Sequence, residues 1–246
     1  MTRIEQHMEF LDSRILNNQV LGNTYGGRTR ENLQTILQAG YIKRGDRVLE
    51  IGTGDGLMLT LLAEAEISAT GVCKSRSDYE ACKAKGLDIH FADMSDLPFP
   101  DQSFDFIYTR NAFDHSLMPA ITLSEFRRVL KAHKKMWIEF EWFSVEDVSK
   151  HTEVRRVGSI YKRGGSYNKH RHWSAMTWEQ MQWLLRRLDF DLIDSFFANE
   201  SQAFIVENAP YRGGGADNLD QWGRIRGDDA KGKSRSPLAK IRRLFG

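Results

Sequence analysis

The residues Val48–Gly56 read Val-Leu-Glu-Ile-Gly-Thr-Gly-Asp-Gly, and the prediction of the fold starts from them. Its first four residues form a short, mostly apolar run of the kind that builds a buried strand, and a glycine-rich turn follows at once. The turn leads into Leu57–Ala65, where the pattern predicts a helix. Glycines let a backbone approach a ligand closely, and the first amides of a helix have no partner within it. The stretch therefore predicts a strand, a ligand-binding turn and a helix.

The spacing of the glycines indicates which ligand the turn accepts. A dinucleotide-binding turn has the pattern G-x-G-x-x-G, whereas the pattern here is G-x-G-x-G, followed by Leu57. Glu50 stands two residues before the first glycine, and its carboxylate would repel a pyrophosphate. A ligand that carries an ammonium group would tolerate this carboxylate. The residues therefore favour S-adenosylmethionine, which has an amine and a positive sulfur, over NAD.

Short apolar runs alternate with helical stretches along most of the chain, which is typical of βαβ units and a parallel sheet covered on both faces. We expect an α/β fold with a Rossmann-like, seven-stranded, mostly parallel sheet. Thr29 is a candidate N-cap for a helix over 31–39, and Thr177-x-x-Gln180 is a capping box. The expected strands are 48–51, 69–73, 88–92, 104–109, 136–142, 191–198 and 202–207, and the later helices are 57–65, 78–85, 117–131 and 178–188.

Further motifs make the chain resemble the class I S-adenosylmethionine-dependent methyltransferases, particularly the large type 11 group that acts on small molecules, lipids and sugars. The resemblance covers roughly residues 41–207 and implies the class I methyltransferase fold. Besides the glycines it rests on the segments 42–47, 92–99, 103–108, 125–131, and 170–173 with 177–179, in the order of the family.

The resemblance implies where the cofactor S-adenosylmethionine binds. Asp93 would accept a hydrogen bond from the adenine amino group, Met94 would pack on the ring, and Asn111 would lie beside the sulfur. Tyr25 and Arg28 are further candidates, which would close over the cofactor carboxylate from the N-terminal region. The methionine end would be lined by Glu50, Gly52, Thr53, Gly54 and Gly56.

Two departures from the family pattern stand out. Cys73 occupies the position at the end of the second strand where the family has an acid that binds the ribose hydroxyls, and a thiol is a weak hydrogen-bond partner. Ser75, Ser77 or Asp78 could substitute, and the alternative is that cofactor binding is weak or lost. Residues 131–135 replace the family's Pro-Gly-Gly turn, so we expect a surface turn there.

Candidate general bases lie after the fourth and fifth strands, because ligands of open α/β sheets bind beyond the carboxyl ends of the strands. Asp114 and His115 follow the fourth strand, and histidine is suited to proton transfer near neutral pH. Glu139 and Glu141 share one face of the fifth strand, which indicates a polar cavity or a metal, or else a solvated strand end. We name His115, Asp114 and Glu141 as catalytic candidates and expect no metal site.

Residues 143–173 are the least family-like part, and residues 143–175 are the expected substrate lid. Seven Lys or Arg, three Asp or Glu and three His lie within 143–173, mixed with aromatic residues, and Gly164-Gly165 could act as a hinge. A basic lid favours an acceptor with carboxylate, phosphate or sugar character, although a solvated loop is an equal alternative. The Asn/Asp-Pro-Pro-Tyr/Phe motif typical of DNA-amine methyltransferases does not follow the fourth strand, so DNA is disfavoured while RNA stays possible.

The ends of the chain differ from its centre. Residues 1–46 are expected to form a helical cap, and residues 211–246 a flexible tail with nine Lys or Arg and four Asp or Glu. Residues 236–245 suggest a short basic amphipathic helix that could touch anionic lipid or a partner. Two cysteines, no apolar signal region and no run long enough for a membrane span favour a cytoplasmic location.

Together these features predict a methyltransferase domain over residues 47–210 that uses S-adenosylmethionine. The expected acceptor is an oxygen or nitrogen of a small-molecule or glycan-like, anionic compound. An RNA or other polyanion methyltransferase is one alternative. A non-catalytic binding subunit that keeps the fold is the other, and Cys73 is the feature that permits it.

Overall fold

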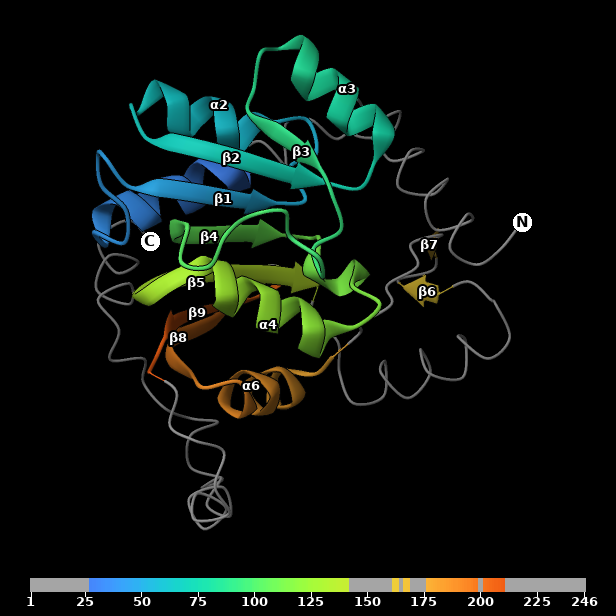
Figure 1. Ribbon diagram of the computed structural model, residues 1–246. Coiled ribbons are helices and arrows are strands. Elements are labelled where there is room, and N and C mark those ends of the chain that lie inside the picture. Colours follow the sequence, from blue (N-terminus) through green and yellow to red (C-terminus); the bar gives the residue numbers. More distant parts are fainter. Residues whose placement is uncertain (1–26, 142–160, 164–165, 169–175, 199–200, 211–246) are drawn as a thin grey trace.

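The computed structural model describes residues 27–141, 161–163, 166–168, 176–198 and 201–210. Within these residues the main sheet has seven strands in the order β3-β2-β1-β4-β5-β9-β8 (Figure 1). The first five strands run parallel and the last two antiparallel, which confirms the predicted fold class. The strands are β1 (Arg47–Ile51), β2 (Ser68–Cys73), β3 (Ile89–Phe91), β4 (Phe104–Arg110), β5 (Leu130–Glu141), β8 (Phe190–Ala198) and β9 (Ser201–Asn208).

Helices cover both faces of the sheet, as the alternation of strands and helices predicts. The helices α4 (Pro119–Val129) and α6 (Trp178–Arg187) lie in front of the sheet in Figure 1. A helix over residues 27–38 and α2 (Leu57–Glu64) pack on the opposite face, and α3 (Arg76–Ala84) covers β2 and β3. Both bonds of the predicted capping box at the start of α6 are present.

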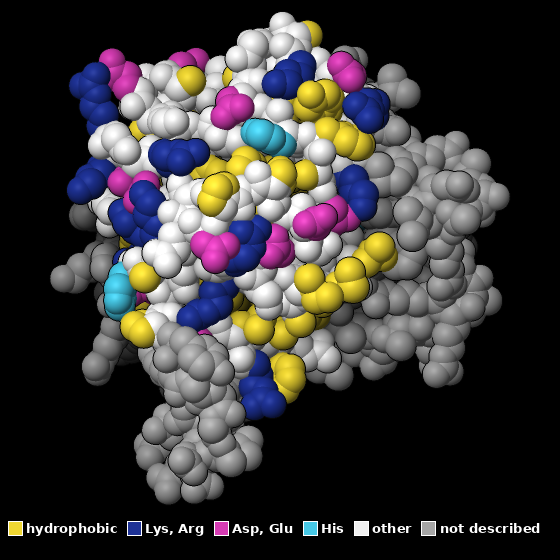
Figure 2. Space-filling model, viewed as in Figure 1, with side chains coloured by type: hydrophobic (Ala, Val, Ile, Leu, Met, Phe, Trp, Pro, Cys, Tyr) yellow, Lys and Arg dark blue, Asp and Glu magenta, His cyan; other side chains and the backbone are white. Residues whose placement is uncertain are grey.

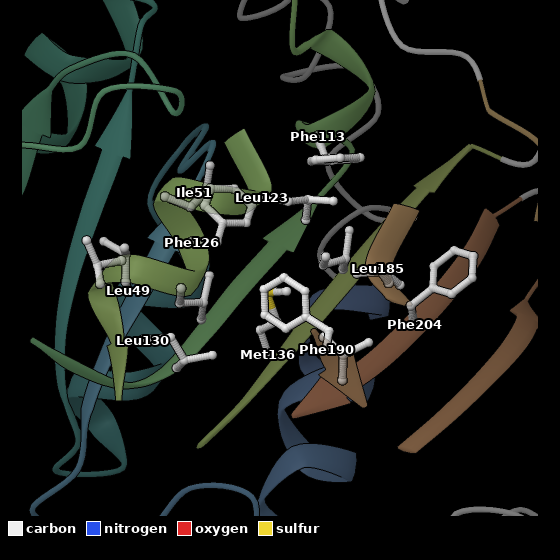
Figure 3. Close-up of a cluster of buried hydrophobic side chains, with 14 of the residues drawn as sticks. Leu49, Ile51, Phe113, Leu123, Phe126, Leu130, Met136, Leu185, Phe190 and Phe204 are labelled. Atoms are coloured by element: carbon white, nitrogen blue, oxygen red, sulfur yellow. The ribbon is translucent and has the colours of Figure 1, made fainter. Parts of the chain in front are cut away.

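The face under α4 and α6 carries the larger apolar core (Figure 3). Phe113 and Phe126 pack together with Phe140, and each is fully buried. Burying one such aromatic side chain contributes about 1.5–3 kcal/mol. This packing fixes β1, β4 and β5 relative to one another, and with them the loops that leave their carboxyl ends.

The helix over residues 27–38 is anchored on the other face by its own apolar side chains. Leu33 and Ile36 pack against a cluster that includes Val48, Phe106 and Trp137. The prediction that Thr29 caps a helix beginning at residue 31 is wrong, because the helix already includes residues 27–30. The Thr29 side chain instead accepts a hydrogen bond from Arg110, 2.9 Å away, across to β4.

The expected turn at residues 131–135 is also wrong. β5 begins at Leu130, which pairs with Phe104, and the pairing register shifts before Lys135 pairs with Phe106. Lys131 and Lys134 place their ammonium groups 2.9 and 3.1 Å from Asp105 of the neighbouring strand. These ion pairs tie the segment to β4, so it is a bulged part of β5, in which His133 has a left-handed φ of 60°.

Some expectations fall on parts of the chain that the structure does not describe. Tyr25, most of the expected lid and the expected C-terminal helix lie there. Within the expected lid, β6 (Tyr161–Arg163) and β7 (Ser166–Asn168) form an antiparallel pair. None of the helices in the described ranges is long and apolar enough to cross a membrane.

Candidate cofactor and acceptor site

The three glycines after β1 differ in the space around them. All three have positive φ angles, of 77° at Gly52, 55° at Gly54 and 80° at Gly56. A Cβ atom on Gly52 would lie 2.2 Å from the Cβ of Ala112, and one on Gly56 would lie 2.4 Å from Leu87. A Cβ on Gly54 would meet no atom within 4 Å. Gly52 and Gly56 are therefore needed for close packing, whereas Gly54 faces open space that a ligand can occupy.

Glu50 lies at the end of β1 with only 6% of its surface exposed. Burial, together with the nearby charge of Asp55, raises its pKa well above the ordinary value, and a hydrogen bond from the Leu59 amide offsets only part of this effect. Among the described residues, its buried Oε2 has no hydrogen-bond partner. A buried carboxylate oxygen without a partner is unfavourable unless a donor or cation arrives. The ammonium group of S-adenosylmethionine fits this requirement.

Asp93 follows β3 at the same edge of the sheet. Its Oδ1 accepts hydrogen bonds from the Ser95 amide at 2.9 Å and the Ser95 hydroxyl at 2.6 Å, and its Oδ2 contacts the Lys74 ammonium. Partial burial alone would raise the pKa of Asp93, but these bonds outweigh it and lower the pKa. Met94 packs against the larger core. The carboxylate is thus ionised and oriented, as an acceptor for an adenine amino group must be.

Cys73 is directed into the packing under α3. It is buried beside Cys82 and Ile89, and its Sγ lies 3.5 Å from the carbonyl oxygen of Ser75. Burial raises its pKa to about 12, so the thiol stays protonated near neutral pH. The Ser75 hydroxyl, a candidate partner for the ribose, already accepts a hydrogen bond from the Asp78 amide as the N-cap of α3. The residues therefore fit the methionine and adenine ends of the cofactor, while the ribose position departs from the family pattern.

The acceptor side is built on the segment that follows β4. Asn111 has a left-handed φ of 51°, and its amide donates to the carbonyl of Glu139 at 2.7 Å. The short helix η1 (Phe113–His115) follows, with Asp114 and His115 both buried. Ala112, which packs on Gly52, joins these features to the glycine turn. The structure thus brings Asp114 and His115 to the end of the sheet that carries the glycine turn.

The two glutamates of β5 have different surroundings. Glu139 is 1% exposed and accepts hydrogen bonds from Arg28, Asn32 and Trp137, so its interpretation as a solvated strand end is wrong. Glu141, the last residue of β5, is partly buried. Within the described ranges, no group of three or more His, Cys, Asp or Glu side chains could hold a metal ion.

Sequence analysis missed the cluster around Glu139. Arg28 and Asn32 are four residues apart, so they share one face of a helix, and a buried acid on a strand requires such partners. The spacing of Arg28 and Asn32 was visible in the sequence, but nothing in the local pattern pairs them with Glu139. Lys74 was also missed, although it is the cation next to Asp93 at the end of β2.

Comparison with known proteins places the chain among methyltransferases. A family model described as "Methyltransferase domain" matches residues 25–195. The chain is 33% identical over 104 residues to O-methyltransferase rstn1 of Aspergillus nomiae, covering 39% of this chain and 46% of that protein. It is 26% identical over 149 residues to 24-methylenesterol C-methyltransferase 2 of Arabidopsis thaliana, covering 54% and 40%. The chain thus spans less than half the length of these curated relatives.

Solved structures agree with this comparison at the level of the fold. A SAM-dependent methyltransferase from Methanosarcina mazei superimposes with a TM-score of 0.58 at 17% identity, covering 71% of this chain and 98% of that one. The family and the fold imply S-adenosylmethionine as the methyl donor. Because the family model matches well over half of the sequence, the chain belongs to the methyltransferase-domain family.

Proposed function

We propose that this protein transfers the methyl group of S-adenosylmethionine to an oxygen or nitrogen of a small-molecule acceptor. The observation that carries the proposal is the buried carboxylate of Glu50, whose Oε2 has no partner among the described residues, beside the open space at Gly54. A binding site for an ammonium-bearing nucleoside accounts for both features. The relative named as an O-methyltransferase supports oxygen as the first choice of acceptor atom.

Each end of the cofactor would have its own contacts. Glu50 would accept from the ammonium group, and Arg28 would pair with the carboxylate. Asp93 would accept from the adenine amino group while Met94 packs on the ring. When bound, the donor supplies a methyl carbon attached to a positive sulfur, so the protein needs mainly to align the acceptor with it and to exclude water.

His115 is the proposed general base. A ring nitrogen of His115 would take the proton from the acceptor hydroxyl or amine as the new bond to carbon forms. Asp114, the preceding residue of η1, and Glu141 at the end of β5 are the other candidates for this role. The burial of His115 and Asp114 supports the proposal. In a site that excludes water, the proton passes from the acceptor to the base and not to solvent.

The proposed acceptor combines an anionic or glycan-like group with an apolar part. The basic composition of residues 143–173 supports the anionic group. Leu117, Met118 and Ile121, each about half exposed, directly follow η1 and support the apolar part. Figure 2 shows apolar side chains gathered on this face near the start of α4.

The test is a methyl-transfer assay with labelled S-adenosylmethionine and a panel of hydroxylated and aminated acceptors, with and without carboxylate, phosphate or sugar groups. We expect labelled product from at least one anionic acceptor. His115→Asn should lower kcat by about a hundredfold or more while leaving the Kd for S-adenosylhomocysteine within about twofold. Tight S-adenosylhomocysteine binding without transfer to any acceptor class would instead favour a non-catalytic binding subunit.

A further inference from the structure

The cluster around Glu139 joins the helix over residues 27–38 to the sheet. Its Oε1 accepts from the Arg28 Nε at 3.1 Å, and its Oε2 accepts from Asn32 at 2.7 Å and from the Trp137 indole at 3.1 Å. Asn32 also donates to the Tyr108 hydroxyl at 3.0 Å. A carboxylate this buried requires such partners. The bonds hold the side chains of Arg28, Asn32, Tyr108 and Trp137 in one arrangement around Glu139.

The strand register places this cluster next to the glycine turn. Glu139 pairs with Arg110, and the residue before Arg110 pairs with Ile51. Gly52 follows Ile51 directly, so the cluster borders the turn on the β4 side. The first turn of the helix over residues 27–38 therefore meets the sheet where the amino-acid end of the cofactor would lie.

Arg28 is held at only part of its guanidinium group. Its Nε donates to Glu139, and its Nη1 lies 3.5 Å from the exposed carboxylate of Glu31. Its Nη2 is buried and, among the described residues, has no hydrogen-bond partner. A guanidinium is planar and rigid, so a bond at Nε fixes the direction of the other N–H groups. The Nη2 group, which has no partner among the described residues, is suited to bind an anion such as a carboxylate.

We propose that Glu139 is a positioning residue that holds Arg28 with its Nη2 directed to the carboxylate of the cofactor. This inference rests on the proposed function and deepens it, because it assigns the anion-binding end of the same site. Glu139 itself would touch no cofactor atom. Its effect would therefore be confined to ligands that carry the amino-acid carboxylate.

The experiment compares two ligands on the full chain by calorimetry. S-adenosylhomocysteine carries the carboxylate, and 5′-methylthioadenosine lacks the whole amino-acid end. Glu139→Gln and Arg28→Gln should weaken S-adenosylhomocysteine binding by about tenfold to a hundredfold, the range for a lost hydrogen bond to a charged group. Binding of 5′-methylthioadenosine should stay within about twofold. Glu31→Gln, which alters the exposed acid partner of Arg28, is the matched control and should leave both affinities unchanged.

Each outcome decides the proposal. Equal weakening of both ligands by Glu139→Gln, or no weakening of either, would overturn it and leave Glu139 with a purely structural role. If Glu139→Gln fails to fold, Glu139→Asp replaces it, because the shorter acid keeps the charge but draws away from Arg28, and it should also weaken S-adenosylhomocysteine alone. Failure of the unaltered protein to bind S-adenosylhomocysteine would instead remove the proposed function itself.

Discussion

The buried carboxylate of Glu50 lowers the stability of the ligand-free protein and is expected to raise its affinity for the ligand. Its carboxylate is buried at the end of β1, and its Oε2 has no partner among the described residues. Burial makes the ionised form of Glu50 unfavourable in the ligand-free protein, and this raises the pKa of Glu50. A bound ammonium group would relieve the same cost, which would add to the affinity for the ligand.

Replacing Glu50 by Gln should stabilise the ligand-free protein and weaken ligand binding. Because the folded-state pKa is raised, the unfavourable contribution is absent below the unfolded pKa of about 4.3 and grows as the pH rises through the folded value. At about pH 8 we expect Glu50→Gln to raise the free energy of unfolding by about 1–3 kcal/mol, with little difference at about pH 4. Urea unfolding at both pH values measures this. A variant less stable than the parent at the higher pH would contradict the account.

Gly54 and Gly86 form a matched pair for testing the open space at the turn. Both have positive φ angles, 55° and 72°, and a Cβ on either would meet nothing within 4 Å. Gly54→Ala and Gly86→Ala should therefore each lower the free energy of unfolding by about 1 kcal/mol through backbone strain. Only Gly54→Ala should weaken S-adenosylhomocysteine binding, which calorimetry measures. Equal affinities in the two variants would show that the space at Gly54 is not where the ligand lies.

At the scale of elements, α4 holds the loop that carries Asp93. Glu125 accepts a hydrogen bond from the Leu97 amide at 2.9 Å, and Arg128 donates to the carbonyls of Leu97 and Phe99 at 3.0 and 2.7 Å. The two side chains also pair with each other at 2.8 Å. The helix thereby fixes a loop whose own secondary structure is minimal. We therefore expect the proposed adenine end of the site to depend on this support.

Arg128→Met should loosen that loop. We expect a loss of about 1–3 kcal/mol in the free energy of unfolding, since several hydrogen bonds to a charged group are removed. Hydrogen exchange at the amides of Leu97, Phe99 and Asp101 should become faster, and 5′-methylthioadenosine should bind more weakly. Arg44→Met is the control, because Arg44 pairs with Glu66 on the exposed surface and such pairs contribute at most about 1 kcal/mol. Unchanged exchange at 97–101 would refute the proposed support.

At the scale of the whole molecule, the features encoded locally were predictable. The strand, glycine turn and helix over residues 47–64 follow from adjacent residues, and so does the capping box at Thr177 and Gln180. The parallel direction of β1 to β5 follows from the alternation of apolar runs with helical stretches, whereas β8 and β9, which follow each other without a helix between them, run antiparallel. The structure brings Glu50, Asp93 and His115 to one edge of the sheet because the parallel strands that precede them end there.

The remaining features depend on contacts between distant residues. Glu139 meets Arg28 and Asn32 across more than 100 positions, so no local pattern predicts the cluster. The inclusion of residues 131–135 in β5 depends on ion pairs with Asp105, which the local sequence does not indicate either. The pair β6 and β7 is different, because Gly164-Gly165 between two short runs is a hairpin signal that sequence analysis interpreted as a hinge.

Ligand binding should also stabilise the folded chain as a whole. At a concentration of S-adenosylhomocysteine about a hundredfold above its Kd, the free energy of unfolding should rise by about 2.7 kcal/mol. Urea unfolding with and without ligand measures this increase. Adenine at the same concentration, which lacks the ammonium group and should have a higher Kd, should give a much smaller increase; an equal increase would show that Glu50 takes no part in binding.

A nucleoside that carries an ammonium group should bind at the turn after β1. Calorimetric titration of the unaltered protein with S-adenosylhomocysteine measures this binding. We expect saturable, one-to-one binding that weakens in Glu50→Gln. A protein that is folded by circular dichroism yet takes up no S-adenosylhomocysteine at about millimolar concentration, where a Kd of about 1 mM corresponds to only about 4 kcal/mol, would contradict it.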